Sequence, residues 1–326
     1  MKLKKSLLAV LALAFGVAES NAGYNTLITV AGGTFGAGTN FKGQAAPSVK
    51  MGETEVSWTE FQSLRTYGAS IGFDFGLGAT GNSGNAPVEN VNWYSALKFC
   101  NVGSIDDGKA PVYYTGTLAI TRLTSASTTA TATVPAGHKL STGNWVNVTW
   151  ATPAGYNLLR SVTVTNGTQF TYQTVVSGTA AATSATAKVI YTSGDVVPLI
   201  DATANGYRLP TEKEWEWSAW GGVSSGTYTY SGSNTANVVA WTRDNQPTPG
   251  AGAQVVGDKS ANELGFYDMS GNVFEWIFDD ATPLYGRRVR GGGWTTDATA
   301  SRTMNRGYRD PAKIEAGFGF RVSTNP

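Results

Sequence analysis

The feature that most constrains the fold is a long acid-free stretch in the middle of the chain. From Gly108 to Gly194 the sequence contains not one Asp or Glu, and Thr, Ala, Val and Ser dominate it. Short runs of alternating apolar and polar residues, such as TATATV and NWVNVTW, lie there between Gly, Pro and Asn turns. This pattern is typical of short, half-buried strands. We therefore expect residues 117–194 to form a small all-β domain inserted into another domain, because surface loops tolerate long insertions.

The flanking segments carry helical as well as strand-like signals. Residues 24–116 combine strand-like runs such as NTLITVAGGTF with an amphipathic helix predicted at about 92–102. After Asp195, the run PTEKEWEWSAW opens with Pro-Thr and carries acidic residues in its first turn, which predicts a second helix. We expect an α+β, loop-rich domain that is discontinuous in sequence, formed by residues 23–116 and 195–326.

The first 22 residues have the composition of a secretory signal peptide. Lys2, Lys4 and Lys5 precede a short apolar run from Leu7 to Ala18, and small residues lead to a cleavage point after Ala22. We expect residues 1–22 to be removed and the protein to be exported to the periplasm, the cell surface or the extracellular medium, with an uncleaved anchor as the alternative. No other segment predicts a membrane span. The net charge of +1 argues against nucleic acid as a partner.

The chain contains one cysteine and one histidine. Cys100 cannot form an intrachain disulfide, and its position in the apolar run NWYSALKFCN predicts a buried small side chain rather than a reactive thiol. His138 lies in the predicted β domain and cannot by itself form a metal-binding triad.

Seven segments outside the β domain resemble the formylglycine-generating enzyme (sulfatase-modifying factor) family, whose fold is C-type-lectin-like. They occur in the family's order and cover nearly all of the chain outside the insertion. The segments are AGGTFGAGT (31–39), GETEVSWTEF (52–61), PVENVNWYSALKFCN (87–101), NGYRLPTEKEWEWSA (205–219), NELGFYDMSGNVFEWIFDD (262–280), RVRGGGW (288–294) and GFGFRV (317–322). The inserted stretch resembles, more loosely, the small β repeats of phage tail-fibre and bacterial surface proteins.

The resemblance implies that an active member would carry two copper-binding cysteines after the glycine-rich motif. Here Thr296 and Ser301 stand at the corresponding positions. Hydroxyl groups are poor ligands for a soft copper ion, which prefers thiolates. The sulfoxide-synthase branch of the fold needs several histidines, which this chain lacks. We therefore expect a catalytically inactive member that binds no copper, and an active oxidase is the least supported reading.

The resemblance also implies a structural calcium site. Asp268 and Glu275 would supply carboxylate oxygens, and Gly271 and Val273 would supply main-chain carbonyls, a ligand set that suits a hard cation. The alternative is that Asp268 caps a turn and Glu275 pairs with an arginine. A second family site would use Asn237 and Val238, but its later ligands are not recognisable.

Several glutamates lie beside tryptophans in the sequence. Glu214, Glu216 and Glu275 neighbour Trp215, Trp217 and Trp276, so these carboxylates are expected to be buried and to need partners. The available cationic partners are Arg208, Arg290, Arg302 and Arg321. An ion-pair network that stabilises the fold is favoured over a catalytic role.

The segment 295–308 is predicted to be the ligand-binding surface of a non-catalytic recognition protein. Loops on a rigid scaffold are where binding residues concentrate. Variable proteins of diversity-generating retroelements share the fold and vary in the corresponding segment. The candidate residues are Thr295, Thr296, Asp297, Thr299, Ser301, Thr303, Asn305 and Tyr308. Arg302 and Arg306 are left out because they are expected to point inward to carboxylates.

The ligand class stays open between a protein and a glycan. The alternative function is a structural or assembly protein of a cell surface, filament or virion, which the β domain and the low charge favour.

Overall fold

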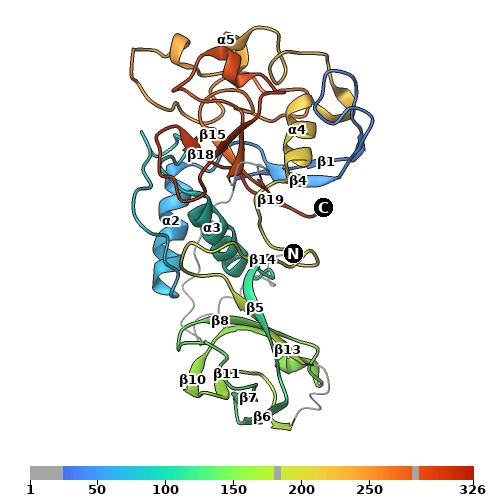
Figure 1. The fold of residues 1–326 in the computed structure, drawn as a ribbon, viewed down its shortest axis with the longest axis vertical. Helices are drawn as coiled ribbons and strands as arrows, with labels where there is room; N and C mark the ends of the chain where they lie inside the picture. The colour runs from blue at the N-terminus through green and yellow to red at the C-terminus, as the bar shows by residue number, and fades with distance from the viewer. Residues whose placement is uncertain (1–24, 180–184, 281–285) are drawn as a thin grey trace, which may run out of the picture.

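The computed structural model describes residues 25–179, 185–280 and 286–326. These residues form two parts stacked along the long axis of the molecule (Figure 1). We call the upper part the host domain and the lower part the inserted module. The predicted signal peptide lies outside the described residues. No helix in the described ranges is long and apolar enough to cross a membrane.

Two helices lie in the part of the host domain nearest the inserted module (Figure 1). Helix α2 (Trp58–Ser70) begins at Ser57, whose hydroxyl accepts a hydrogen bond from the amide of Glu60 while the Glu60 carboxylate accepts one from the amide of Ser57. Helix α3 (Trp93–Asp106) begins at Asn92 and is buried along almost its whole length. The helix predicted at about 92–102 is confirmed, and it continues to Asp106.

A four-stranded sheet packs against these helices. Its strands, in spatial order, are β17 (Gly307–Arg309), β16 (Arg287–Arg290), β15 (Phe274–Asp280) and β18 (Phe318–Gly319). Only the β15–β18 pair in this sheet is parallel. Trp276 on β15 donates a hydrogen bond from Nε1 to the carbonyl of Val91 at 2.8 Å, and this bond ties the sheet to the start of α3.

A second layer of the host domain joins both ends of the described chain. Strands β1 (Leu27–Val30), β4 (Val49–Gly52) and β19 (Ser323–Thr324) form an antiparallel sheet, and β2 (Gly33–Thr34) pairs with β3 (Ala45–Ala46). Helix α4 (Glu212–Trp220) packs here through the buried rings of Trp215 and Trp217. A capping box of Thr211 and Glu214 begins this helix, so the second predicted helix is also confirmed.

Short elements complete the host domain. They are α5 (Ala236–Val239) and the 3₁₀ helices η2 (Gly222–Ser224), η3 (Arg243–Asn245) and η4 (Ala298–Ser301). The α+β, loop-rich class expected from the sequence is therefore what the structure has.

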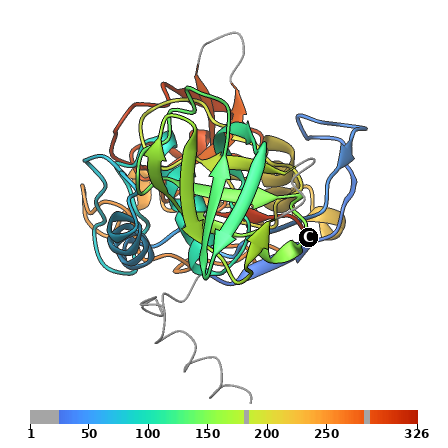
Figure 2. The same ribbon diagram turned by 90° about the horizontal axis from the view of Figure 1, so that it is seen from below.

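The inserted module consists of two five-stranded sheets with a core between them; Figure 2 shows its strands from below. One sheet has the order β10 (Thr163–Asn166), β11 (Gln169–Gln173), β7 (Thr129–Thr133), β6 (Arg122–Ala126) and β12 (Gly178–Thr179). The other has the order β14 (Leu199–Ile200), β5 (Tyr113–Ala119), β13 (Thr186–Ile190), β8 (Trp145–Thr149) and β9 (Leu159–Ser161). A 3₁₀ helix, η1, spans Ala154–Tyr156.

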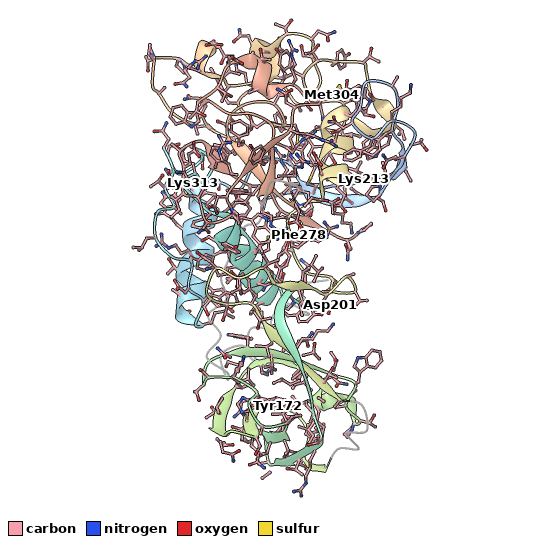
Figure 3. The ribbon with its side chains drawn as sticks, in the orientation of Figure 1. Tyr172, Asp201, Lys213, Phe278, Met304 and Lys313 are labelled. Atoms are coloured by element: carbon pink, nitrogen blue, oxygen red, sulfur yellow. The ribbon has the colours of Figure 1, made fainter. Side chains whose placement is uncertain are left out.

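The alternating pattern in the sequence explains the module's core. In β7, for example, Ala130 and Ala132 are buried while the threonines on either side are half-exposed. Phe170, Tyr172 and Tyr156 fill the centre of the module, and Tyr172 is labelled there in Figure 3. This cluster is separate from the cores of the host domain.

Two strands run continuously from the module into the host domain. Tyr113 at the start of β5 and Ile190 at the end of β13 both belong to the host core, as does Tyr191. The sequence assigned Ile190 and Tyr191 to the inserted domain, because a change in composition does not show where a strand crosses from one core into the next. A hydrogen bond from Trp145 Nε1 to the carbonyl of Ile71, 2.9 Å long, is a further link between the two parts.

Candidate binding site

The segment 295–308 is anchored at both ends. The amide of Trp294 donates to the carbonyl of Asn272 at 2.7 Å, and its indole donates to Glu89 at 3.0 Å. The same Glu89 oxygen accepts a hydrogen bond from the amide of Gly317, just beyond the segment. Between these anchors the chain forms η4 and then the edge strand β17, so the segment contains regular structure and is not only a loop.

The stretch 301–304 alternates between buried and exposed side chains. Ser301 and Thr303 are buried, with exposed fractions of 0% and 2%, whereas Arg302 and Met304 are exposed. Ser301 and Thr303, two of the predicted binding residues, are therefore not on the surface. Arg302, which is expected from the sequence to point inward, points outward because an extended backbone turns successive side chains to opposite faces.

The other predicted binding residues divide between scaffold and surface. Thr296 donates to the carbonyl of Gly293 at 3.0 Å, and Asp297 caps η4 by accepting hydrogen bonds from the amides of Thr299 and Ala300. Asn305 is half-buried and donates to the carbonyl of Thr299, and Thr295 is also half-buried. The exposed residues of the predicted set are Asp297, Thr299 and Tyr308.

A buried guanidinium supports the segment from below. Arg290 on β16 donates to Glu212 at 2.9 Å, to Glu216 at 2.8 Å and to the carbonyl of Thr303 at 2.6 Å. Arg306 also pairs with Glu212, at 2.8 Å, as the sequence suggested for this residue. The ionic network under the segment therefore fixes the backbone at Thr303.

The loop between β2 and β3 holds the backbone at Met304. Asn40 donates from its main chain and side chain to the carboxylate of Glu216, and its side-chain amide also donates to the carbonyl of Met304 at 2.8 Å. The amide of Thr303 donates to the carbonyl of Thr229 at 3.1 Å. The backbone on either side of Arg302 and Met304 is thus held by three other segments.

These contacts form a hollow of about 450 Å³, which we call the recognition groove. Its lining residues come from three parts of the chain that are distant in sequence: Ala37, Gly38, Trp220, Thr227, Tyr228, Thr229, Arg302, Thr303 and Met304. Among the described residues no carboxylate forms an ion pair with Arg302, although the sequence proposed it as a partner for one. Trp220 and Tyr228 could not be predicted as site residues, because no local signal in the sequence links them to a segment so far along the chain.

Two other glutamates pair with arginines that the sequence offered as partners. Arg321 donates to both oxygens of Glu275, at 2.6 and 2.7 Å, and both side chains are fully buried. Arg208 pairs with Glu214 at 2.7 Å. Arg290 and Glu216 form a third pair, at 2.8 Å. The glutamates expected to need cationic partners therefore have them, and their role in stabilising the fold stays a prediction.

The residues expected to bind calcium fit the ion only in part. Asp268 Oδ2 accepts from the amide of Gly257 at 2.7 Å, while Oδ1 is buried without a hydrogen-bond partner in the described structure. Burial raises the pKa of Asp268 to about 6. Both oxygens of Glu275, in contrast, accept from Arg321, and one also accepts from the indole of Trp215. Asp268 could give an oxygen to a cation, but Glu275 forms the arginine pair that was the alternative.

A lysine lies at the second calcium site that the family resemblance suggests. The ammonium group of Lys259 donates to the carbonyl of Asn237 at 2.7 Å and approaches its side-chain oxygen at 3.4 Å. The carbonyl of Val238 accepts from the amide of Ser260. Here a side-chain cation contacts the oxygens that the family resemblance assigns to a metal.

Thr296 and Ser301 stand at the positions of the family's cysteine pair, and their hydroxyl groups lie in different surroundings. Thr296 is hydrogen-bonded at the start of the segment, whereas Ser301 Oγ is buried without a partner in the described structure. Cys100 lies inside α3, fully buried, and burial raises the pKa of its thiol. A protonated, inaccessible thiol is a poor metal ligand and a poor nucleophile.

Comparisons with known proteins agree with this architecture. The chaperone protein LppX of Paenibacillus barcinonensis is 30% identical over 255 residues, which are 72% of this chain and 69% of LppX. The inactive Cα-formylglycine-generating enzyme 2 of Bos taurus is 31% identical over 133 residues, which are 36% of this chain and 44% of that protein.

Solved structures share the fold along nearly the whole chain. CarF superposes with a TM-score of 0.62 at 20% identity, covering 93% of this chain and 99% of CarF. The Treponema denticola variable protein 1 gives a TM-score of 0.56 at 24% identity, covering 92% and 95%. Among family models, the sulfatase-modifying factor enzyme 1-like domain matches residues 14–326. The chain therefore belongs to the sulfatase-modifying factor family and has its C-type-lectin-like fold.

Proposed function

We propose that this chain is an exported, non-catalytic binding protein that holds a segment of another protein in the recognition groove. The observation that carries the proposal is the exposed guanidinium of Arg302, which has no ion-pair partner in the described structure and lies in a groove lined by Trp220 and Tyr228. Tyrosine, tryptophan and arginine are the residues that contribute most to binding energy in protein interfaces.

The rigidity of the groove supports binding rather than a solvated loop. Arg290, Asn40 and Thr229 hold the backbone around Arg302, so little conformational entropy is lost when a ligand orders this surface. A guanidinium pairs best with a planar carboxylate, through two parallel hydrogen bonds. The ligand expected from this chemistry is a polypeptide with an acidic side chain next to an apolar one that contacts Tyr228 or Met304.

Two relatives are consistent with a binding role. LppX is named a chaperone protein, which fits a polypeptide ligand, and the bovine relative is named an inactive enzyme. We therefore propose that the chain lacks the oxidase activity of the family's active members. Incubation with copper and a cysteine-containing sulfatase peptide should give no formylglycine above a control without protein. Product above that control would restore an enzymatic function.

Selection from a random peptide library on the purified mature protein tests the groove. We expect the selected peptides to be enriched in Asp and Glu, and Arg302→Ala and Tyr228→Ala each to weaken binding by about tenfold or more at an unchanged melting temperature. Tyr308→Ala is the matched control, because Tyr308 is an exposed aromatic residue of the same segment outside the groove lining.

Other outcomes would assign the function elsewhere. Binding that depends on Tyr308 but not on Arg302 would place the site on the β17 edge of the segment. If no peptide is selected and the protein forms filaments on size-exclusion chromatography, the assembly function replaces the present proposal.

We further propose that the segment 295–308 is the region of sequence variation if the chain is a retroelement variable protein. The fold shared with the Treponema denticola variable protein supports this only at the level of architecture. A template repeat and a reverse-transcriptase gene beside the coding sequence are the observations that would decide it.

A further inference from the structure

A second hollow, which we call the junction cleft, lies between the inserted module and the host domain. Its volume is about 370 Å³. Figure 3 labels Asp201 at this junction and Met304 of the recognition groove towards the other end of the molecule, so the two sites are distinct. The lining residues that matter here are Asn147, Thr149, Trp150, Lys188, Asp201 and Thr203.

Trp150 gives the cleft an apolar wall that is open to solvent. Its side chain follows β8 and is 76% exposed, an unusual state for the largest apolar side chain. Its φ is +65°, a left-handed conformation that is unfavourable for a residue with a side chain. The turn after β8 therefore holds the indole at the edge of the cleft rather than in the core of the module.

The polar groups of the cleft carry no net charge and include both hydrogen-bond donors and hydrogen-bond acceptors. Lys188 forms an ion pair with Asp201, and Asp201 also accepts a hydrogen bond from the hydroxyl of Thr203 at 2.7 Å. The half-buried side-chain amide of Asn147 has no hydrogen-bond partner in the described structure. Asn147 and Thr149 lie on β8, directly opposite Lys188 and Thr186 of β13, so the sheet holds their spacing.

We propose that the junction cleft binds a neutral saccharide whose ring stacks on Trp150. A sugar ring has a face of C–H groups that suits an aromatic surface and a rim of hydroxyls that each donate and accept hydrogen bonds. An amide, an ammonium and a carboxylate at the cleft match that rim. A fully apolar ligand would leave these groups without water or partners, and a charged ligand would compete with one member of the Lys188–Asp201 pair.

This site extends the function beyond the protein-binding groove. It combines Trp150 and Lys188 of the inserted module with Asp201 of the host domain, and it needs no residue of the segment 295–308. Loss of one activity therefore leaves the other measurable.

Isothermal titration calorimetry of the full mature chain with maltopentaose, cellopentaose and chitopentaose tests the proposal. We expect at least one of these neutral oligosaccharides to bind, and Trp150→Ala to weaken its binding by about tenfold or more. Asn147→Ala should weaken it by about fivefold, because one hydrogen bond is lost. Both variants should keep the wild-type melting temperature, since neither side chain is in the core.

Two controls separate this site from others. Val175→Ala removes an exposed apolar side chain of the same module outside the cleft and should leave saccharide affinity unchanged. Arg302→Ala should weaken peptide binding only. The proposal is overturned if none of the three oligosaccharides binds, or if binding is equally strong in Trp150→Ala and Asn147→Ala.

Discussion

At the scale of single residues, the interior of the host domain contains buried ion pairs among its apolar side chains. Glu275 and Arg321 are both fully buried, and the guanidinium also donates to the carbonyls of Gly52 and Tyr267. Removing one charge of a buried pair takes away the hydrogen-bonded ionic partner of the other, which costs about 3–5 kcal/mol. We expect Glu275→Gln to lower the free energy of unfolding by that amount in urea denaturation.

An exposed pair is the matched control for this substitution. Asp244 lies 3.5 Å from Arg243, and more than half of each side chain is exposed. Solvent screens such a pair, so Asp244→Asn should change the free energy of unfolding by no more than about 1 kcal/mol. Equal effects of the two substitutions would contradict the role given to burial.

We also propose, from the family motif, that the protein binds calcium, and this prediction depends on single residues. Asp268 retains one buried oxygen without a partner, so a cation that binds only the folded state would raise the melting temperature. Melting of the wild type in calcium and in chelator measures this, with Asp268→Asn as the variant that should lose the difference. An unchanged wild-type midpoint would exclude calcium, and the partners of Glu275 would then be Arg321 and Trp215.

At the scale of elements, the backbone turn that leads into the segment 295–308 requires a glycine. Gly292 has a φ of +73°, and a Cβ there would lie 2.5 Å from Ser301 Oγ and 2.8 Å from the main-chain carbon of Ala300. Gly43 has a similar φ of +77° but open space around it. Gly43→Ala should therefore cost about 1–2 kcal/mol from the backbone alone. Gly292→Ala should cost a further 1–3 kcal/mol or so from the clash, measured by urea denaturation.

Peptide affinity of the same two variants gives a second readout. If the glycine turn positions the segment, Gly292→Ala weakens peptide binding and Gly43→Ala does not. Equal stability losses in both variants would mean that the segment yields to the added methyl group and is not rigid.

Local signals explain which elements could be predicted from the sequence. The helices at 93–106 and 212–220 begin at caps that are readable in the sequence, and the alternation in TATAT places Ala130 and Ala132 inside the module. Which side chains of residues 301–304 are buried and which are exposed could not be predicted from local signals. This arrangement is set by Arg290, Asn40 and Thr229, which reach the segment from distant parts of the chain.

At the scale of the whole molecule, the inserted module and the host domain have separate cores but share two strands. Leu118 of β5 packs against the module's core while Tyr113 of the same strand belongs to the host core. The sheet that crosses the junction positions both walls of the junction cleft, since Lys188 lies on β13 and Asp201 follows β14. The saccharide site thus depends on the insertion, whereas the recognition groove belongs to the host domain alone.

A deletion designed on strand register tests this independence. Gly116 and Val189 are paired partners on β5 and β13, so an Asn-Gly turn can join them after residues 117–188 are removed. This deletion keeps Ile190 and Tyr191, which the host core contains, and the carbonyl of Tyr191 that accepts from the side chain of Asn101. We expect a soluble host domain with a cooperative thermal transition and wild-type peptide affinity, but no oligosaccharide binding.

Deletion of residues 117–194, the boundary read from composition, is the matched comparison. It removes Ile190 and Tyr191 and also the carbonyl of Thr192, which accepts a hydrogen bond from the amide of Asp74. Loss of two large buried side chains costs on the order of 5 kcal/mol or more, about the whole stability of many domains. The longer deletion should therefore be insoluble or lack a cooperative transition. If the shorter deletion fails in the same way, the contacts of Trp145 and Leu159 with the host core are indispensable, and the module is part of the host fold rather than an addition to it.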